Sequence, residues 1–235
     1  MERLDKILAG TGRWSRREVK VLIRAGRVRV NGAVLCSPEE KIDRNATLLV
    51  DGEAVNGARF VYLMLHKPAG LLSATEDPRQ PTVLELLPEP MRRIGLFPVG
   101  RLDKDTEGLL LLTNDGALAH RLLSPKKHVD KVYFVQVDGI LDGADVHAFH
   151  QGMVLNGTTC LPAGLEVLSP PDQALITLHE GKYHQIKRML AARGKPVVYL
   201  KRLSMGPLTL DPTLSPGGWR LLTPEELASL PMLDS

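Results

Sequence analysis

The clearest pattern of hydrophobic and polar positions lies near the start of the chain. Val19, Leu22 and Ile23 recur at the three- and four-residue spacing of one helix face, while basic side chains crowd the other side. Ser15 and Glu18 fit a capping box, which predicts that the helix begins there. One face of this helix is therefore predicted to pack and the other to be cationic.

A hairpin is predicted directly after this helix. Residues 27–30 alternate as a half-buried strand does, and Asn31 and Gly32 form a strong two-residue turn signal. Residues 33–35 can return as the second strand, and residues 47–51 add another. The first part of the chain is thus predicted to be a small helix and hairpin unit.

The remainder of the chain mixes extended and helical patterns. A small, turn-prone stretch predicts a boundary between a domain at 1–58 and a second domain at 59–235. Strands are predicted at 60–65, 71–75, 109–113, 131–137, 164–168 and 174–179. Helices are predicted at 83–87, 116–123, 142–151 and 184–192, and after the capping-box residues Thr223 and Glu226. The fold class is α+β.

Composition narrows the class of protein. Of 235 residues, 24% are charged and 43% hydrophobic, which excludes a wholly disordered or collagen-like chain. The longest purely aliphatic run, Leu109–Leu112, is far shorter than the about 20 apolar residues of a membrane helix, and the N-terminus lacks a signal-peptide pattern. We expect a soluble cytoplasmic protein. Two cysteines without close partners favour neither structural zinc nor a disulfide framework.

The net charge of +3 is unevenly distributed along the chain. Residues 1–30 carry nine basic and three acidic side chains, and residues 182–202 carry seven basic and no acidic ones. Two separated basic surfaces suit a long polyanion, because neutralising its phosphates requires cations spread along one path. The alternative is an ordinary solvated charged face.

The densest group of polar side chains precedes the strongest apolar run. Asp103, Asp105, Glu107 and Gly108 imitate the first positions of a calcium-binding loop, but Asn114 stands where a bidentate glutamate is needed. A magnesium site completed by distant carboxylates stays open. A polar turn that only caps a strand is the simplest alternative.

Arg101 gives Asp103 a further interpretation. Extended backbone would place both side chains on one face, where the guanidinium would hold the carboxylate ionised and oriented. An ionised aspartate suits a nucleophile or a general base, and the pattern alone does not distinguish these roles.

Several motifs, in this order along the chain, are similar to those of RsuA/RluA-type pseudouridine synthases with an N-terminal S4 RNA-binding domain. The S4-like part is carried by residues 15–32. The remaining motifs are HKPAG at 66–70, GRLD at 100–103 followed by DTEGLLLLTNDG at 105–116, KVY at 131–133, EGKYHQIKRM at 180–189 and PGGWRLLTPEE at 216–226. The resemblance implies a small S4-like (α-L) domain followed by a larger catalytic domain with a mixed, mainly antiparallel sheet flanked by helices.

The activity that the resemblance implies is isomerisation of a uridine in RNA. The bond between N1 and C1′ is cut, the base rotates, and it is rejoined through C5. Asp103 matches the family's catalytic aspartate, which either attacks the nucleotide or abstracts a sugar proton. Tyr133 matches a tyrosine that stacks on the base, and Lys187 a basic residue, arginine in many relatives, that pairs with the aspartate. Arg101 matches a basic residue that fills the space left by the flipped nucleotide.

The resemblance also implies a partner. Motif 180–189 is more similar to small-subunit than to large-subunit members, so the expected substrate is 16S rRNA in an assembling small subunit, at the site of uridine 516. A large-subunit rRNA target or a non-catalytic assembly factor is the alternative. No cofactor or metal is expected, and the protein is expected to be monomeric. The expected RNA contacts are Arg16, Arg17, Lys20, Arg24, His184, Gln185 and Arg188.

Overall fold

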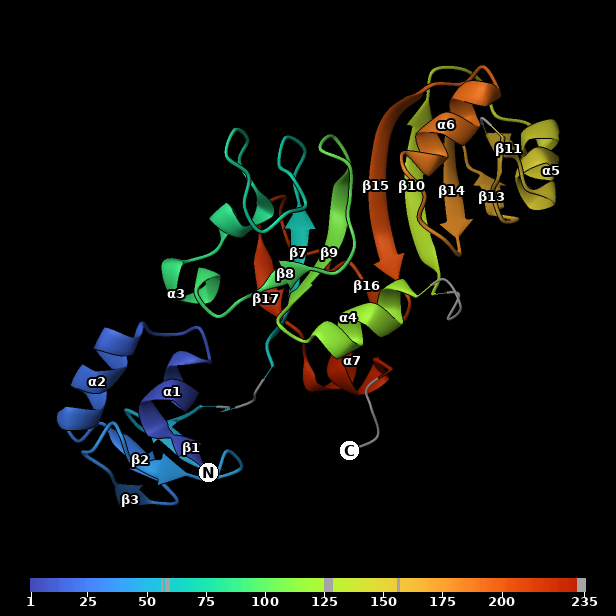
Figure 1. Cartoon of the computed structure of the whole chain (residues 1–235). Coiled ribbons are helices and arrows are strands. Elements are labelled where there is room, and N and C mark those ends of the chain that lie inside the picture. Colours follow the sequence, from blue (N-terminus) through green and yellow to red (C-terminus); the bar gives the residue numbers. More distant parts are fainter. Residues whose placement is uncertain (56, 58–59, 125–128, 156, 232–235) are drawn as a thin grey trace.

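The computed structural model describes residues 1–55, 57, 60–124, 129–155 and 157–231 (Figure 1). A small N-terminal domain lies beside one end of a larger C-terminal domain that is built on a long, twisted sheet. Among the described residues, no helix has the length and apolar character needed to cross a membrane. The helical elements are α1 (Leu4–Ala9), α2 (Arg16–Arg24), η1 (Val83–Leu86), α3 (Glu89–Arg92), α4 (Gly116–Leu123), α5 (Gly143–Gln151), α6 (Gln185–Ala192) and α7 (Pro224–Ser229).

The N-terminal domain packs α1 and α2 against a four-stranded sheet. The capping box predicted at the start of α2 is present: Glu18 N donates to Ser15 Oγ, and Ser15 N donates to the Glu18 carboxylate. The predicted hairpin is also present. Its sheet order is β3-β2-β5-β6, from β2 (Val28–Val30), β3 (Ala33–Val34), β5 (Leu48–Val50) and β6 (Glu53–Val55), while β1 (Glu2–Arg3) pairs with β4 (Lys41–Ile42).

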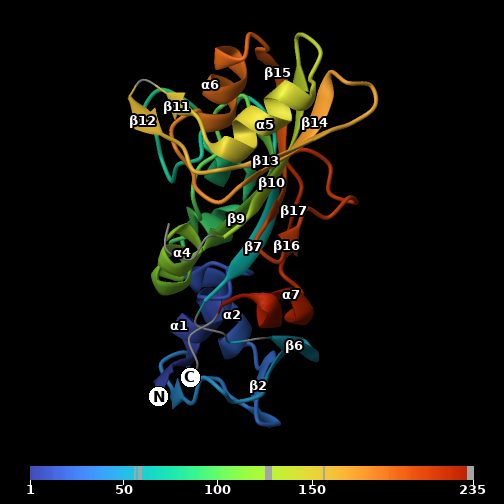
Figure 2. The same ribbon diagram turned by 90° about the vertical axis from the view of Figure 1, so that its right-hand side faces the viewer.

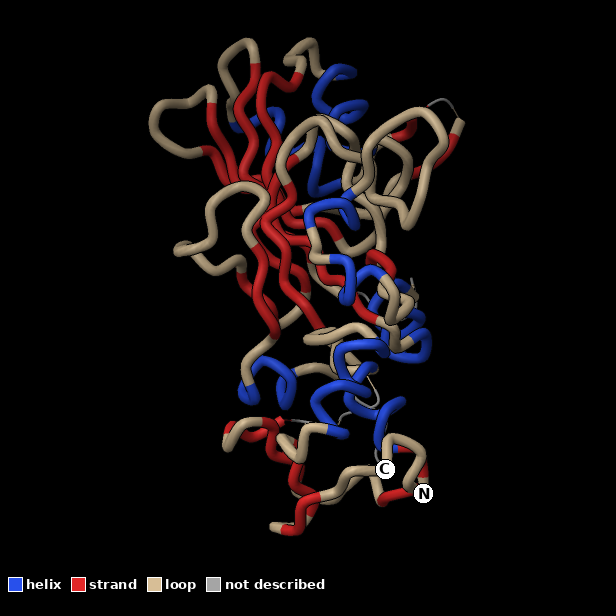
Figure 3. The backbone as a smooth tube through the Cα atoms, turned by 90° about the vertical axis from the view of Figure 1, so that its left-hand side faces the viewer, coloured by secondary structure: helices blue, strands red, loops and turns tan. Residues whose placement is uncertain are grey.

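The C-terminal domain contains a nine-stranded sheet of order β13-β14-β10-β15-β9-β7-β17, with β16 beside β15 and β8 beside β9 (Figures 1 and 3). Among the described strands of this sheet, β15 and β9 are the one pair that runs parallel, so the expected mixed, mainly antiparallel sheet is confirmed. The strands are β7 (Tyr62–Lys67), β8 (Phe97–Pro98), β9 (Glu107–Thr113), β10 (Lys131–Val137), β13 (Gly164–Val167), β14 (Gln173–Leu178), β15 (Val197–Met205), β16 (Leu208–Thr209) and β17 (Trp219–Leu221). A separate hairpin joins β11 (Val154–Leu155) and β12 (Thr158–Thr159).

Hydrophobic periodicity explains how each strand is covered. On β10, Tyr133, Val135 and Val137 are buried and alternate with partly exposed residues, because one face of this strand packs under α5 and α6 (Figure 2). On β9, almost every residue is buried. Leu110 and Leu112 pack with η1 and α3, and their neighbours pack with α4 and α7 on the opposite face. This two-sided burial accounts for the continuous leucine run.

Two sequence-based predictions for this domain were wrong. Residues 71–75 form no strand, because the prolines nearby leave only an isolated bridge between Leu72 and Thr82. The nine-residue strand β15, in the middle of the sheet, was missed because Lys201 and Arg202 interrupt its apolar pattern. The proposed boundary at residue 58 lies outside the described residues.

Candidate active site

Asp103 lies in the loop between β8 and β9. Here the two halves of the large sheet meet, one half being β13-β14-β10-β15 and the other β9-β7-β17. The β9–β15 ladder there consists of two residue pairs, Lys201 with Glu107 and Arg202 with Gly108. A turn, closed by Thr106 N donating to Asp103 O, presents the Asp103 side chain, which is 26% exposed. A carboxylate at the end of such a ladder can meet side chains from both halves of the sheet.

Helix α6 supplies the partners of Asp103. Its core face carries Ile186 and Met189, so Lys187 projects from another side of the helix. Lys187 Nζ lies 3.2 Å from Asp103 Oδ2, and His184 Nε2 lies 3.5 Å from Asp103 Oδ1. The structure therefore brings together three residues that are up to 84 positions apart in sequence.

His184 is held in the left-handed region, with φ of 47°, at the position before α6. Its side chain makes no hydrogen bond to the helix terminus. The Tyr183 ring stacks on the His184 ring, with centroids 3.9 Å apart and planes 16° apart. Tyr183 is 76% exposed, which leaves its outer face open to a base.

Lys187 is shared between two carboxylates. Its Nζ lies 2.5 Å from Asp105 Oδ1, closer than it lies to Asp103. The hydrogen bond from Lys187 lowers the pKa of Asp105. Burial lowers the pKa of Lys187, but the hydrogen bond and charge of the two carboxylates outweigh burial and raise it. One ammonium thus serves as a point charge for both carboxylates, where arginine would form a bidentate pair.

Arg101 does not pair with Asp103 in the described part of the chain, contrary to the expectation from their spacing. The segment leads into a turn instead of continuing as a strand, and Gly100 before it has φ of 79°. Arg101 is exposed, with its guanidinium free to reach a ligand. Tyr133 is 8% exposed on β10, next to Arg202 across the ladder. Its ring is part of the main core cluster.

The three carboxylates between residues 103 and 107 have two different partners. Asp103 and Asp105 meet Lys187, whereas Glu107 accepts a hydrogen bond of 2.8 Å from the Tyr199 hydroxyl. Within the described ranges, no group of three or more His, Cys, Asp or Glu residues is arranged to hold a metal ion. The calcium-loop interpretation fails on this geometry because the carboxylates do not converge.

Sequence reasoning missed the role of Lys67. Its side chain is fully buried, and its ammonium donates to the carbonyl oxygens of Pro68, Lys104 and Thr106 at 2.9, 3.1 and 2.9 Å. Burial lowers its pKa to about 8, although nearby carboxylates, Asp105 foremost, oppose this shift. The signals in the sequence were a lysine at the end of an apolar strand and its place in the HKPAG motif at 66–70. Lys67 ties the loop that carries Asp103 to β7.

Gln185 and Arg188 were expected at the RNA surface, and the structure gives them local partners. Gln185 is 4% exposed, donates to Glu180 at 2.8 Å, and accepts from Lys182 N at 3.0 Å. Arg188 makes long hydrogen bonds of 3.5 and 3.4 Å to the carbonyls of Tyr183 and Leu155. The Gln185 side chain thus binds the backbone just before α6, and the Arg188 side chain links that backbone to β11.

The basic surface expected from residues 182–202 is largely neutralised. Arg193 and Lys195 both pair with the buried carboxylate of Asp145, and Arg202 is itself 2% exposed. Lys182 pairs with Glu180, and Lys187 with the loop carboxylates. Three of these cations, Lys187, Arg193 and Lys195, meet carboxylates that are distant in sequence.

The cationic face of α2 is present as expected. Arg16, Arg17, Lys20 and Arg24 surround Val21, which is 62% exposed, and together they line a shallow hollow of about 390 Å³. Among the described residues, these four cations form no ion pair with a carboxylate within 4.0 Å. An unneutralised helix face of this kind is suited to a phosphate backbone.

Comparisons with known proteins agree with these features. The model of the RNA pseudouridylate synthase family matches residues 61–192, and the S4 domain model matches residues 2–48. An uncharacterised RNA pseudouridine synthase of Bacillus subtilis is 50% identical, with 96% of each chain covered. The ribosomal small subunit pseudouridine synthase A of Pseudomonas aeruginosa is 42% identical, over 97% of this chain and 100% of its own.

A solved structure is similar to this chain over almost its whole length. A crystal structure of a pseudouridylate synthase superposes with a TM-score of 0.69 at 35% identity, covering 97% of this chain and 99% of that one. The family match covers more than half of the chain, and the S4 match coincides with the helix and hairpin domain that bears the cationic α2 face. The chain therefore belongs to the RNA pseudouridylate synthase family and is a pseudouridine synthase with an N-terminal S4 domain.

Proposed function

We propose that this enzyme isomerises one uridine of 16S rRNA, at the site of uridine 516, with Asp103 as the catalytic carboxylate. The observation that carries the proposal is the cluster of Asp103, Lys187 and His184 at the junction of the two half-sheets. The small-subunit target is supported by relatives such as the Pseudomonas aeruginosa enzyme, whose name specifies the ribosomal small subunit.

The geometry suits chemistry at C1′ of a flipped-out nucleotide. The Asp103 carboxylate is partly exposed, and its Oδ2 lies 3.2 Å from the Lys187 ammonium. From this position it can attack the nucleotide, or it can take a proton from the sugar as the bond to N1 breaks. The uracil then rotates, C5 bonds to C1′, and the proton lost from C5 is balanced by one gained at N1.

Surrounding side chains have defined roles in this proposal. In this proposal Tyr133 forms a wall against the base, and the exposed guanidinium of Arg101 replaces the extruded nucleotide in the RNA stack. The cationic face of α2 holds the RNA backbone at a distance from the reaction, because phosphate contacts position the nucleic acid without reading its sequence. No redox step or group donor is needed for an isomerisation.

The test is a map of pseudouridine in cells with and without this gene, read by carbodiimide-dependent primer-extension stops on both rRNAs. We expect one stop in 16S rRNA to disappear with the gene and to return with the wild type. Asp103→Asn keeps the size and loses the charge, so it should bind RNA normally and leave the stop absent. A restored stop in that variant would remove Asp103 from the mechanism.

Two other outcomes have definite meanings. Loss of a stop in 23S rRNA would replace the small-subunit target with a large-subunit one. No difference in either rRNA would favour a non-catalytic role in ribosome assembly.

A further inference from the structure

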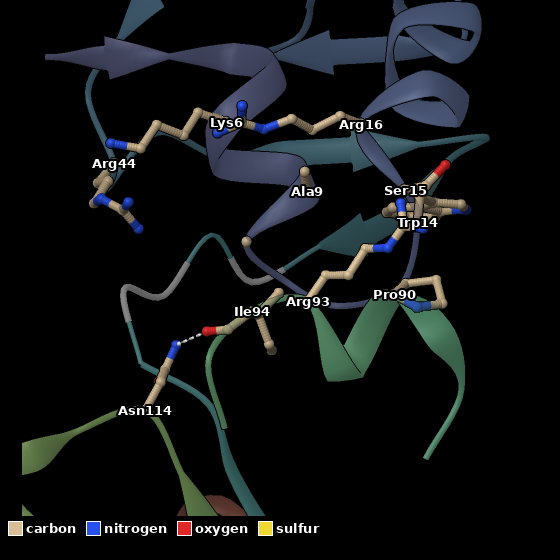
Figure 4. Close-up of a pocket in the computed structure, with 11 residues that line it drawn as sticks. Lys6, Ala9, Trp14, Ser15, Arg16, Arg44, Pro90, Arg93, Ile94 and Asn114 are labelled. Atoms are coloured by element: carbon tan, nitrogen blue, oxygen red, sulfur yellow. Dashed lines mark hydrogen bonds between the residues drawn. The ribbon is translucent and has the colours of Figure 1, made fainter. Parts of the chain in front are cut away.

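A cavity of about 330 Å³ lies where the S4 domain meets the catalytic domain (Figure 4). Its S4 wall comes from α1, the start of α2 and Arg44. Its catalytic wall comes from Pro90, Arg93 and Ile94 of the α3 segment, with Asn114 at one side. None of the residues grouped around Asp103 lines this cavity, so it is separate from the candidate active site.

The S4 domain and the α3 segment of the catalytic domain pack against each other beside the cavity. A Cβ added at Gly12 of the S4 domain would lie 2.5 Å from Met91 Sδ and 3.1 Å from Ile94 Cδ1, so the two domains meet closely there. Asn114 holds the catalytic wall by donating to Ile94 O at 3.2 Å and accepting from Val61 N at 2.9 Å. The cavity is therefore bounded by packed elements on both sides.

The cavity has a surplus of positive charge. Lys6 and Arg44 both pair with Glu2, and Arg93 pairs with Glu89, whereas Arg16 makes no ion pair within the described residues. Four cations thus face two carboxylates. The remaining positive charge has no protein partner and suits an anionic ligand.

Two further features indicate what kind of anion fits. Arg16 lines both this cavity and the hollow on α2, so the cations of the two hollows adjoin at Arg16. Trp14 also lines the cavity, and Arg93, directly after α3, extends toward it (Figure 4). A path of phosphate-binding cations with an aromatic ring beside it matches single-stranded nucleic acid, which offers regularly spaced phosphates and flat bases.

We propose that this cavity binds one unpaired nucleotide of the substrate RNA, with its base against Trp14 and its flanking phosphates on Arg16 and Arg93. The proposal rests on the proposed function insofar as the ligand is RNA. Bound in this way, the RNA strand bridges the two domains and fixes how the S4 domain presents it to the catalytic site. Arg93, which belongs to the catalytic domain, becomes part of the RNA-binding surface.

The test is the affinity of the full-length protein for a transcribed 16S rRNA, measured at several salt concentrations. Arg93→Gln and Arg16→Gln should each weaken binding and reduce the slope of log affinity against log salt by about 1. Arg121→Gln is the matched control: this arginine of the catalytic domain donates to Pro231 O outside the cavity and should leave affinity unchanged. Unchanged affinity in Arg93→Gln would overturn the proposal.

A gain-of-affinity variant excludes a merely structural explanation. Glu89→Gln removes the carboxylate that pairs with Arg93 while keeping its size, so it should strengthen RNA binding and increase the salt slope. A loss of RNA affinity in this variant would contradict the proposal. Unfolding is no explanation for tighter binding, so this result is independent of stability.

Tryptophan fluorescence reports the base contact directly. In a Trp219→Phe background, Trp14 is the single tryptophan, and stacking of a base should quench its emission when the RNA binds. Absence of quenching at saturating RNA would remove Trp14 from the site. Isomerisation is measured separately: an enzyme that binds RNA through Arg93 but forms no pseudouridine would refute the proposed function and leave this inference standing.

Discussion

Lys67 carries a charge into the interior of the catalytic domain. Two of its three hydrogen bonds reach Lys104 O and Thr106 O, in the loop that presents Asp103 and Asp105, and the third reaches Pro68 O. A neutral apolar side chain of similar length would leave those carbonyl groups without their donor. Each such loss costs about 1–3 kcal/mol, and it falls on the segment whose position matters for the reaction.

Lys67→Met should therefore lower kcat far more than it changes RNA affinity. A shift of about 1 Å in a reacting group can cost about 100-fold in rate, and Lys67 itself does not touch the substrate. Single-turnover pseudouridine formation together with RNA binding measures this split. A parallel loss of kcat and affinity would mean that the whole domain, rather than the loop, has been disturbed.

The lowered pKa of Lys67 also predicts a pH dependence of stability. The folded pKa is about 8 and the ordinary value 10.5, so between these the unfolded chain binds more protons than the folded one. The free energy of unfolding of the wild type, relative to Lys67→Met, should rise as pH increases from 8 to 10.5 and stay constant below pH 8. Urea titrations of both proteins across this range measure the difference, and a fall would contradict the assignment.

At the scale of residues, the candidate site was predictable only in part. The motifs of a known family predicted that Lys187 lies beside Asp103, and the structure brings these two side chains together. The role of Tyr133 stays a prediction. The sharing of Lys187 by Asp105 was not predicted, because it depends on how α6 is placed against a loop about 80 residues earlier.

At the scale of elements, the parallel contact between β9 and β15 depends on Gly108. With φ of 107°, Gly108 lies so close to the other strand that a Cβ would come within 2.2 Å of Arg202 O and 2.6 Å of Arg202 N. Only glycine permits this approach. The two halves of the sheet can thus join directly beside the Asp103 loop.

Gly108→Ala should destabilise the protein by at least about 2 kcal/mol, from backbone strain and a clash with rigid backbone atoms. Gly143→Ala is the matched control, because its Cβ would meet nothing within 4 Å and Gly143 has no positive φ. Denaturant unfolding followed by circular dichroism compares the two. Equal stability of both variants would show that β9 and β15 separate without cost.

At the scale of the whole molecule, the S4 domain has its own hydrophobic core. Leu4, Ile23, Val28 and Leu48 belong to a cluster that includes no residue beyond Val55 among its buried members. The catalytic domain has two clusters, one on each face of its sheet. Separate cores are the property that lets each domain fold independently.

Deletion of residues 1–58 should accordingly leave a folded catalytic domain that binds 16S rRNA more weakly and with a smaller salt dependence. The lost segment includes the cationic face of α2, whose side chains account for several phosphate contacts. Circular dichroism and thermal unfolding establish the fold of the truncated protein, and binding at several salt concentrations tests the rest. Unchanged affinity at each salt concentration would contradict a role of the S4 domain in RNA binding.

The amino-acid sequence by itself determined the elements whose signals are local. The capping box of α2, the Asn31–Gly32 hairpin and the alternation of β10 each depend on residues within a few positions of one another. Such signals can be recognised without knowledge of the fold, because residues that are neighbours in sequence are always close in space.

Only the tertiary structure decided the features that join distant segments. It placed β15 in the middle of the sheet despite its charged residues, and it neutralised Arg193 and Lys195 with Asp145. It also created the cavity between the two domains. The physical reason is common to all three: the burial and pairing of a charge depend on partners that lie far away in sequence, and only the folded chain brings them into contact.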